Sequence, residues 1–422
     1  MNKVFPGVIV VLTLFISCQK EANLTIKNQL NTARTDEAIV LPRALVEQKL
    51  QLKAGMLPVF KTPNGEIIPG QIDDLDGDGI WDEAVMVLDF AASELMNINI
   101  ELVPETEYPE FDKRTNLRLG IKQEDGTYTE VDNYRALPCS DGFEIIAQAE
   151  SVNWENDKIG FRVYFDCRNV KDLFGKLKPE LIIDKIHTSE LPNYHELAEW
   201  GMDVLHCGSS LGSGGLAILK NDSLFRLGST EVYEYQKIVE GPVRSIFELR
   251  YAGWDVNGEK LKAVERITIY PGKYWFESDV TIEGSSGEFQ IVTGIVTSRL
   301  TREPFEFKAG NFQCIGTHDV QSLNKDELGM AVLVPLAETG KIARTTDINF
   351  FKLGFETVVE KGFSNIISET YYIGQKSKNN IPAKHYFFSV WGLDKEQWKT
   401  EEGFRKYITE ESERLSSPMA VK

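Results

Sequence analysis

The sequence predicts an all-β protein, a large antiparallel β-sandwich with few short helices. From residue 39 onwards, apolar and polar residues alternate along short segments bounded by Gly, Asn, Asp and Pro. Helical periodicity is scarce, and no regular strand–helix–strand rhythm indicates a parallel sheet. Because a long antiparallel sheet must close or cover its edges, stacking into a sandwich is the expected architecture.

The alternating segments are the predicted strands. In residues 243–251, for example, Phe247 and Leu249 share one face, while Glu248 and Arg250 share the other. The best helix candidate is residues 394–411, which carry apolar side chains at helical spacing. The clearest predicted strands are residues 97–103, 116–122, 160–165, 243–251, 264–270, 274–283 and 329–335.

The N-terminus is typical of an exported lipoprotein. Lys3 precedes an apolar run over residues 8–16, which is shorter than the ~20 residues that a membrane-spanning helix needs. The following Ser17-Cys18 resembles a lipobox, which predicts a signal peptide over residues 1–18 and lipidation of Cys18. An ordinary secretory signal is the alternative. We therefore expect an outer-membrane-anchored protein, periplasmic or on the cell surface, attached to the membrane through its N-terminal lipid.

Behind the anchor, composition predicts a simple organisation. Residues 19–36 are polar and predict a flexible tether, and residues 37–418 contain no Pro- or Ser-rich linker, which predicts one sandwich domain. We expect the remaining cysteines to be mainly buried, with at most one disulfide. These cysteines are Cys139, Cys167, Cys207 and Cys314.

The charge distribution excludes some partners. The formal net charge is −18, the pI is near 4.9, and no basic block occurs. Nucleic acid is therefore not an expected partner, since its phosphates require clustered Lys and Arg. A site for an acidic sugar would have to be a small group of cations on an anionic surface.

An aspartate-rich stretch is a candidate calcium site. Its carboxylates are spaced as in an EF-type loop, with Gly79 at the sharp turn, but Val85 stands where the last ligand is expected. The alternative is a β-hairpin tip with solvated carboxylates. We expect a structural Ca²⁺ as the candidate cofactor and no organic cofactor. The candidate ligands are Asp74, Asp76, Asp78, Asp82 and Glu83.

A second segment combines titratable side chains with a Gly/Ser-rich turn over residues 208–215. His195, Trp200, Asp203 and His206 precede or enter this turn, and Ser210 lies within it. A sugar site could form here, although a loop with a satisfied core histidine is the alternative. The turn lacks the sequence of a nucleotide-binding loop, and His195 lacks the second histidine of a zinc-protease helix.

A third group lies on predicted neighbouring strands. Tyr233, Tyr235, Arg244 and Arg266 are its main members, and His318 is a further candidate from a later segment. Arginines on the strand face away from the core can bind a carboxylate with two hydrogen bonds. Cross-strand ion pairs with neighbouring glutamates are the alternative.

Three runs resemble one protein family. The runs are residues 69–83 with the Asp-Gly-Asp-Gly repeat, residues 199–205 (Glu-Trp-Gly-Met-Asp-Val-Leu) followed by Ser210-Leu211-Gly212, and residues 240–244 (Glu-Gly-Pro-Val-Arg). They resemble a domain-of-unknown-function family of exported proteins from polysaccharide-digesting bacteria. One branch is an oligosaccharide dehydratase that acts on ulvan, a sulfated polysaccharide of rhamnose and uronic acid. The resemblance spans about residues 38–410.

The resemblance implies a carbon–oxygen lyase that removes water from a non-reducing-end glucuronyl residue and leaves a 4,5-unsaturated sugar. This β-elimination needs a cation at the carboxylate, a base for the C5 proton and a proton donor. On chemical grounds we expect Arg244 or Arg266 as the cation and His195 or His318 as the base. The expected acid is Tyr233 or Tyr235, and the expected substrate contacts are Trp200, Asp203, His206 and Ser210.

Other functions use the same features. A polysaccharide lyase would share the chemistry with a sugar as leaving group, and a non-catalytic glycan-binding lipoprotein would need only the anchor and the aromatic residues. A mutarotase or epimerase is suggested by analogy to the mutarotase-like supersandwich fold alone. In every case the expected partner is a carbohydrate, and for the leading hypothesis it is an acidic oligosaccharide.

Overall fold

The predicted fold class is confirmed. A computed structural model describes residues 22–136, 146–166, 168–228, 230–346 and 366–422, and most of these lie in antiparallel strands. Cys18, Cys139 and Cys167 lie outside the described residues, whereas Cys207 and Cys314 are buried and free. Among the described residues, no helix combines the length and the apolar character that a bilayer span requires.

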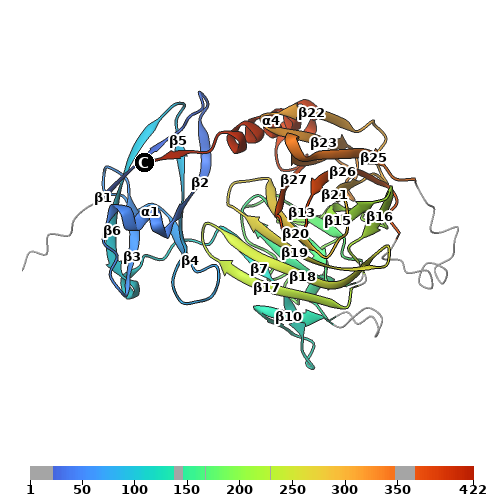
Figure 1. Cartoon of the computed structure of the whole chain (residues 1–422), viewed down its shortest axis with the longest axis horizontal. Helices are drawn as coiled ribbons and strands as arrows, with labels where there is room; N and C mark the ends of the chain where they lie inside the picture. The colour runs from blue at the N-terminus through green and yellow to red at the C-terminus, as the bar shows by residue number, and fades with distance from the viewer. Residues whose placement is uncertain (1–21, 137–145, 167, 229, 347–365) are drawn as a thin grey trace, which may run out of the picture.

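The N-terminal part of the chain forms a smaller lobe with its own core (Figure 1). Two sheets face each other, and apolar side chains such as Leu24, Phe60, Met86 and Ile98 are buried between them. One sheet has the order β28 (Ala420–Val421), β1 (Ala22–Lys27), β6 (Leu95–Pro104), β3 (Met56–Lys61). The other has the order β2 (Arg34–Pro42), β5 (Glu83–Phe90), β4 (Gly70–Asp73), and helix α1 (Arg43–Lys49) follows β2.

This lobe corrects two expectations about organisation. The tether predicted over residues 19–36 is wrong from Ala22 onwards, because β1 pairs with β6 and β2 pairs with β5. Leu24 and Ile26 are fully buried. The short alternation of apolar and polar residues around them therefore forms a strand, although the polar composition of the segment predicted a tether. The sandwich predicted over residues 37–418 corresponds to the larger body alone, since residues up to Pro104 belong to the smaller lobe.

The larger body is the sandwich. Its nine-stranded sheet has the order β10 (Asn133–Ala136), β17 (Val232–Glu240), β18 (Ser245–Val256), β19 (Glu259–Ile269), β20 (Trp275–Glu283), β27 (Ala383–Trp391), β24 (Leu328–Pro335), β23 (Phe312–Asp319), β22 (Phe305–Ala309). One five-stranded sheet has the order β14 (Gly201–Asp203), β13 (Lys171–Lys176), β12 (Ile159–Tyr164), β11 (Ser151–Asn156), β7 (Thr115–Arg118). The other has the order β16 (Ser223–Arg226), β15 (Ser213–Lys220), β21 (Phe289–Val296), β26 (Thr370–Ser377), β25 (Thr339–Arg344). A small hairpin pairs β8 (Gly120–Lys122) with β9 (Tyr128–Glu130).

Aromatic side chains join the sheets of the larger body across its core. Trp154 on β11 stacks on Phe161 of β12 at 5.7 Å and meets Phe247 of β18 at 5.2 Å and Phe276 of β20 at 5.3 Å between ring centroids. Because side chains alternate along a strand, the neighbours of these rings point to the outer faces of the sheets. The outer faces are therefore where polar groups can gather.

Helix α4 (Glu401–Ser416) covers the outer face of the nine-stranded sheet near β22, β23 and β24. Thr400 caps its N-terminus by accepting a hydrogen bond from the Gly403 amide at 3.1 Å, and Phe404 and Ile408 are fully buried. The helix predicted over residues 394–411 is confirmed from Glu401 onwards, and its apolar side chains are buried as expected. The earlier part of the predicted range contains the 3₁₀ segment Glu396–Lys399 instead.

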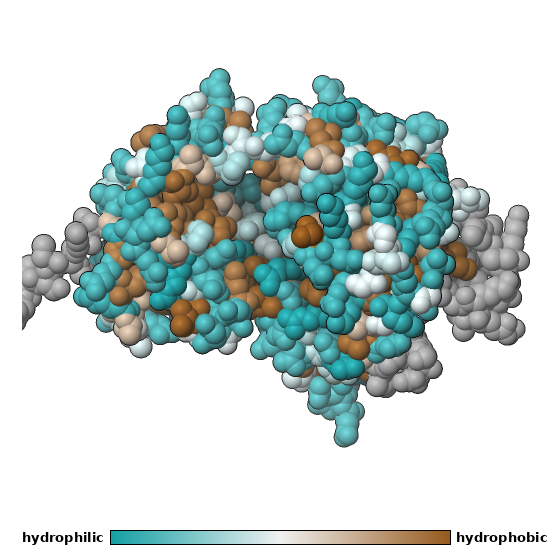
Figure 2. All heavy atoms as spheres, viewed as in Figure 1, coloured by the Kyte–Doolittle hydropathy of each residue, from teal (hydrophilic) through white to brown (hydrophobic). Residues whose placement is uncertain are grey.

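The lobe and the body meet at a buried ion pair. Arg244, just before β18, donates to Asp73 on β4 and to Glu83 on β5, with Nη1 2.7 Å from the Glu83 carboxylate. Gln71 adds a hydrogen bond from its amide to the Arg244 carbonyl at 3.0 Å. The space-filling view shows the surface hollowed beside this junction (Figure 2).

Candidate functional site

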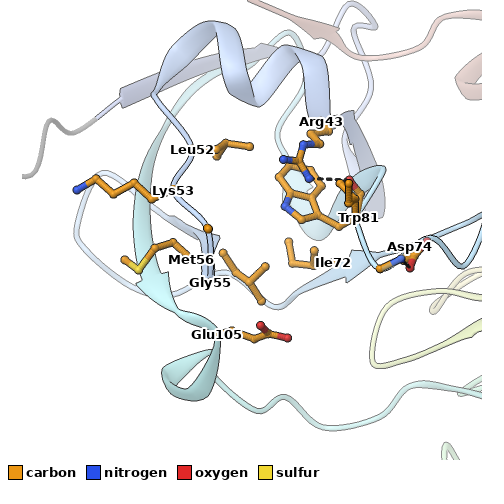
Figure 3. A pocket seen from close by; sticks show the side chains of 13 residues that line it. Arg43, Leu52, Lys53, Gly55, Met56, Ile72, Asp74, Trp81 and Glu105 are labelled. Carbon is orange, nitrogen blue, oxygen red and sulfur yellow. Dashed lines mark hydrogen bonds between the residues drawn. The ribbon is translucent and has the colours of Figure 1, made fainter.

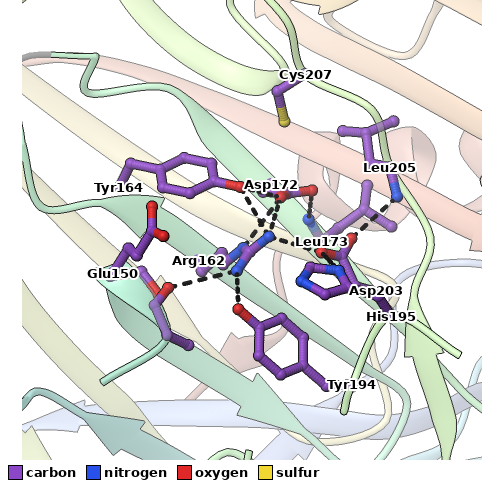
Figure 4. A network of polar contacts seen from close by, with 12 residues as sticks. Glu150, Arg162, Tyr164, Asp172, Leu173, Tyr194, His195, Asp203, Leu205 and Cys207 are labelled. Atoms are coloured by element: carbon purple, nitrogen blue, oxygen red, sulfur yellow. Dashed lines mark hydrogen bonds and ion pairs between the residues drawn. The ribbon is translucent and has the colours of Figure 1, made fainter. Parts of the chain in front are cut away.

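A polar network lies on the outer face of the sheet that contains β12, β13 and β14 (Figure 4). Arg162 on β12 is directly opposite Asp172 on β13, while Phe161 and Val163 point into the core from the same strand. Asp203 ends β14, opposite Phe174. The alternation of the strands therefore brings one cation and two carboxylates to a face that the chain around residues 182–200 covers.

Arg162 is the centre of this network, and it is almost completely buried. Its Nη2 lies 2.6 Å from the Asp172 carboxylate and 2.6 Å from that of Asp203. Its Nη1 donates to the Tyr194 hydroxyl at 3.2 Å, and Nη2 also reaches the Tyr164 hydroxyl at 2.8 Å. These bonds occupy the guanidinium, so Arg162 orients its neighbours and does not offer an open position to a ligand.

His195 contacts solvent on one side and this network on the other. Its Nδ1 lies 3.1 Å from Oδ2 of the buried Asp203, and its side chain is 56% exposed. The hydrogen bond to Asp203 raises the pKa of the imidazole above its ordinary value, and burial opposes this only in part. With Nδ1 bonded to the carboxylate, Nε2 is the ring atom left for proton transfer to a ligand.

Two tyrosines and Asp172 complete the network. The ring of Tyr194 lies 4.2 Å from that of His195, centroid to centroid, which restricts how the imidazole can turn. The Tyr164 hydroxyl donates to Asp172 at 3.1 Å, and burial raises the pKa of this phenol far above its ordinary value. Burial, together with nearby Asp203, also raises the pKa of Asp172 to about 6, against the lowering effect of Arg162.

The edge of the network carries a second arginine and a strained turn. The guanidinium of Arg168 lies 4.1 Å from the Tyr164 ring centroid and 2.6 Å from the Glu150 carboxylate. Ala149 and Glu150 have φ angles of 52° and 60°, a left-handed conformation that costs about 1–3 kcal/mol for each non-glycine residue. Such strain is common beside functional sites, and here it presents Glu150 to Arg168.

The structure does not bring the expected cations to a common site. Arg244 is buried at the junction of lobe and body, where it pairs with Asp73 and Glu83. Arg266 lies on the outer face of the nine-stranded sheet, with Nη2 2.6 Å from the Glu248 carboxylate. The ion-pair alternative therefore describes both arginines, and the expectation that one of them clamps a substrate beside His195 is wrong.

The expected acid residues and the second expected base are also elsewhere. Tyr233 and Tyr235 point into the core of the body, and the Tyr233 hydroxyl donates to Asn169 at 3.1 Å. His318 is buried beneath α4, with Nε2 2.8 Å from the Trp398 carbonyl. The alternation along a strand predicts only the face of the sheet on which a residue lies. It does not predict which segment, distant in sequence, packs over that face.

Of the four expected substrate contacts, Asp203 alone joins the His195 network. Trp200 is buried against Phe174, 6.4 Å between ring centroids. Ser210 is buried and donates to the Cys207 carbonyl at 2.6 Å, so it stabilises the turn. His206 is exposed, and its Nδ1 lies 3.4 Å from the Ser298 hydroxyl.

The aspartate-rich loop between β4 and β5 brings three of its five predicted calcium ligands together. One carboxylate oxygen from each of Asp74, Asp76 and Asp78 lies within 4.8 Å of the others. Asp82 turns away to accept a hydrogen bond from the Leu75 amide at 2.7 Å, and Glu83 faces Arg244. Asp74 accepts from the amides of Gly77 and Gly79, the arrangement expected for a hairpin tip, and calcium binding stays a prediction.

Sequence reasoning missed Arg162, Tyr164, Asp172, Glu150 and Arg168. Residues 160–165 were predicted as a strand, and its alternation already placed Arg162 and Tyr164 on the face opposite Phe161. The signal was thus two polar side chains at period two on a strand whose other face is apolar. Their pairing with Asp172 requires the strand register, which the sequence pattern does not contain.

Comparison with known proteins identifies the family. Residues 26–421 match the family described as "Domain of unknown function (DUF4861)". The chain therefore belongs to this family. It is also similar to a protein named "Uncharacterized protein P7" from Formosa agariphila, with 26% identity across 98% of this chain and 97% of that protein.

Solved structures with a similar chain trace are much longer than this protein. A protein in glycosyl hydrolase family 38 from Enterococcus faecalis superimposes with a TM-score of 0.47 and 10% identity, covering 96% of this chain and 47% of that one. An alpha-mannosidase from Enterococcus faecalis gives a TM-score of 0.45 and 10% identity, covering 96% of this chain and 46% of that one. The chain thus spans about half the length of each.

Proposed function

We propose that this protein is a carbon–oxygen lyase that removes water from the non-reducing-end glucuronyl residue of an ulvan-type oligosaccharide. The observation that carries the proposal is the exposed imidazole of His195 on the buried carboxylate of Asp203. A carboxylate that fixes and polarises a histidine is the usual arrangement of a general base. The family resemblance supplies the substrate class.

His195 would take the C5 proton of the sugar with Nε2. The hydrogen bond between Nδ1 and the Asp203 carboxylate would stabilise the imidazolium that forms, because it places a negative group beside the positive ring. The electrons of the C5–H bond form the C4=C5 double bond, and the C4–O bond breaks. The imidazolium can return the same proton to the departing hydroxyl, so that water leaves and the base is restored.

The hydrogen bonds of the neighbouring tyrosines are consistent with His195 acting as both the base and the acid. The Tyr164 hydroxyl already donates to Asp172 and accepts from Arg162, so its proton is directed away from a ligand at His195. The Tyr194 hydroxyl accepts a hydrogen bond from Arg162, and Tyr194 is buried. His195 is therefore the titratable side chain of this network that solvent reaches most readily.

The sugar carboxylate needs a cation, and Arg168 is our candidate. It is paired with Asp166 and Glu150, and Glu150 is a partly exposed residue on the strained turn. A substrate carboxylate could replace Glu150 on the guanidinium and keep the charge balance of the site. Neutralising that carboxylate lowers the energy of the carbanion-like transition state at C5.

The test uses ulvan oligosaccharides with a glucuronyl non-reducing end. We expect the absorbance of a conjugated double bond to grow, and mass spectrometry to find each product lighter by one water. His195→Gln should reduce kcat by about 10²–10⁴-fold, the range that removal of a general base usually costs. His187→Asn is the matched control, since His187 packs 6.0 Å from the Tyr194 ring but is not bonded to Asp203.

The same assay separates the alternatives. A polysaccharide lyase would release shorter fragments instead of a chain of unchanged length lacking water. A glycan-binding lipoprotein would bind the sugar saturably with every mass unchanged. Unchanged masses across all uronate-terminated substrates would contradict the proposed dehydratase.

We propose further that Cys18 carries the lipid anchor. β1 begins four residues after Cys18, and four extended residues reach at most about 14 Å. The smaller lobe would then lie close to the membrane surface, with the larger body beyond it. Labelling with a radioactive fatty acid, with Cys18→Ser as control, tests the anchor.

A further inference from the structure

The smaller lobe has a pocket of its own, with a volume of about 580 Å³, between the chain after α1 and the aspartate-rich loop (Figure 3). Leu52, Met56 and Ile72 supply apolar walls, and Trp81 stands between them and Arg43. The space-filling view shows apolar side chains gathered on the visible face of this lobe (Figure 2). This pocket belongs to another lobe than the His195 network.

The indole of Trp81 is held in place. The guanidinium carbon of Arg43 lies 5.1 Å from the indole centroid, and Arg43 is itself bonded to Glu47 at 2.8 Å and to the Trp81 carbonyl at 3.4 Å. Trp81 also packs against the core of the lobe. A fixed aromatic ring loses little conformational freedom when a ligand stacks on it.

Three polar side chains that line this pocket have no hydrogen-bonding protein partner in the described part of the chain. Among the residues that the structure describes, no side-chain hydrogen bond or ion pair is formed by Trp81 Nε1, by the ammonium of Lys53 or by the carboxylate of Glu105. Figure 3 shows Lys53 and Glu105 on different sides of the opening. The pocket therefore combines an aromatic platform with two free donors and one free acceptor.

The net charge of the side chains that line the pocket indicates which class of ligand suits it. Arg43 and Lys53 are balanced by Asp74 and Glu105, so the pocket has no net charge. A phosphate, an anionic lipid headgroup or a uronate would meet as much repulsion as attraction here. An uncharged sugar suits the pocket, because its C–H face packs on an indole while its hydroxyls both donate and accept.

We infer that this pocket binds a neutral sugar unit of a glycan chain. The inference rests on the proposed function for the class of ligand, and it assigns to the smaller lobe a binding role separate from the chemistry at His195. Holding a chain at a second point raises the effective concentration of its other residues near the protein. Longer chains should therefore bind more tightly than short ones.

The test measures binding of methyl rhamnoside and methyl glucoside to the full chain by saturation-transfer NMR, with methyl glucuronide as the charged comparison. Lys53→Met combined with Glu105→Gln removes two free groups from exposed positions, and Trp81→Phe keeps a ring but removes Nε1–H. We expect each variant to weaken binding of a neutral glycoside about three- to tenfold, the value of one or two hydrogen bonds. Ile67→Ala is the control, because Ile67 is an exposed apolar residue of the same lobe outside the pocket.

The outcomes separate this inference from the proposed function. His195→Gln should reduce turnover by about 10²–10⁴-fold and leave neutral-glycoside binding unchanged, whereas Lys53→Met/Glu105→Gln should leave turnover of a disaccharide unchanged. Equal binding by the wild type and both pocket variants would overturn the inference. A preference for the glucuronide, or absence of saturable binding by the wild type, would overturn it as well.

Discussion

The imidazole Nδ1 of His195 lies 3.1 Å from Oδ2 of Asp203, and the same oxygen lies 2.6 Å from Nη2 of Arg162. One carboxylate oxygen therefore joins an exposed base to a buried cation. The guanidinium holds the Asp203 carboxylate in place, and that carboxylate in turn orients the histidine. Under the proposed function, proton transfer at His195 therefore depends on residues that a ligand does not touch.

Asp203→Asn should move the acid limb of the pH–rate profile. A general base works only when deprotonated, so kcat/KM falls as the pH drops through the pKa of His195. Asp203 raises that pKa, and its neutral replacement should shift the limb to lower pH while reducing the maximal rate. The measurement is kcat/KM against pH. Glu199→Gln, an exposed change in the same segment, should leave the limb where it is.

Arg162→Met should destabilise the fold. The substitution leaves Asp172 and Asp203 buried without their cation, and breaking a buried ion pair costs about 3–5 kcal/mol. Urea unfolding measures the loss. Arg250→Met, which removes an arginine whose side chain is 45% exposed, should cost far less, and Arg162→Met with Asp172→Asn should recover part of the loss.

His385 should make stability depend on pH. This histidine of β27 is fully buried, and burial lowers its pKa to about 3, so it stays neutral in the fold while the unfolded chain binds a proton below about 6.5. Folding then loses about 1.4 kcal/mol for each pH unit below 6.5, down to about pH 3.

Unfolding free energies at pH 7 and pH 5 test this dependence. His385→Leu should lose about 2 kcal/mol less than the wild type over that interval. A variant of the exposed His187, such as His187→Asn, should keep the wild-type dependence. An identical loss in wild type and His385→Leu would contradict the assignment.

Calcium should stabilise the smaller lobe if the aspartate-rich loop binds it. Backbone hydrogen bonds, first from the Gly79 amide, already lower the pKa of Asp74, so its carboxylate is ionised and able to coordinate. We expect the unfolding temperature to rise with calcium and to fall with a chelator. Asp76→Asn with Asp78→Asn should remove the response, and Asp125→Asn in another exposed turn should not. A response that persists in the double variant would place calcium elsewhere.

Period-two alternation predicted the strands because each side chain of a sandwich strand faces either core or solvent. It assigned Phe247 and Leu249 to the core and Arg250 to the outer face, as found. It missed β1, since six residues in a polar stretch give too few repeats. It also could not divide the chain into lobe and body, because that division depends on which strands pair.

The sequence predicted only some of the residues of the candidate site. His195 and Asp203 attracted interest as titratable residues before a Gly/Ser-rich turn, and they do lie together. Arg162 and Asp172 escaped because charged residues on a strand's outer face are ordinarily solvated, and here the segment containing Tyr194 buries them. Coverage by a distant segment is a tertiary property that alternation does not encode.

The pairing of β1 with β28 gives the order in which the molecule can be completed. Ile26 lies opposite Val421, so the edge of β1 is covered by a strand that follows the whole larger body in the chain. Synthesis delivers the chain from its N-terminus, and early segments usually fold first. Here the earliest lobe must wait, with the edge of β1 open to other strands, until the whole body has emerged. A chain interrupted before β28 would thus carry an exposed edge at β1.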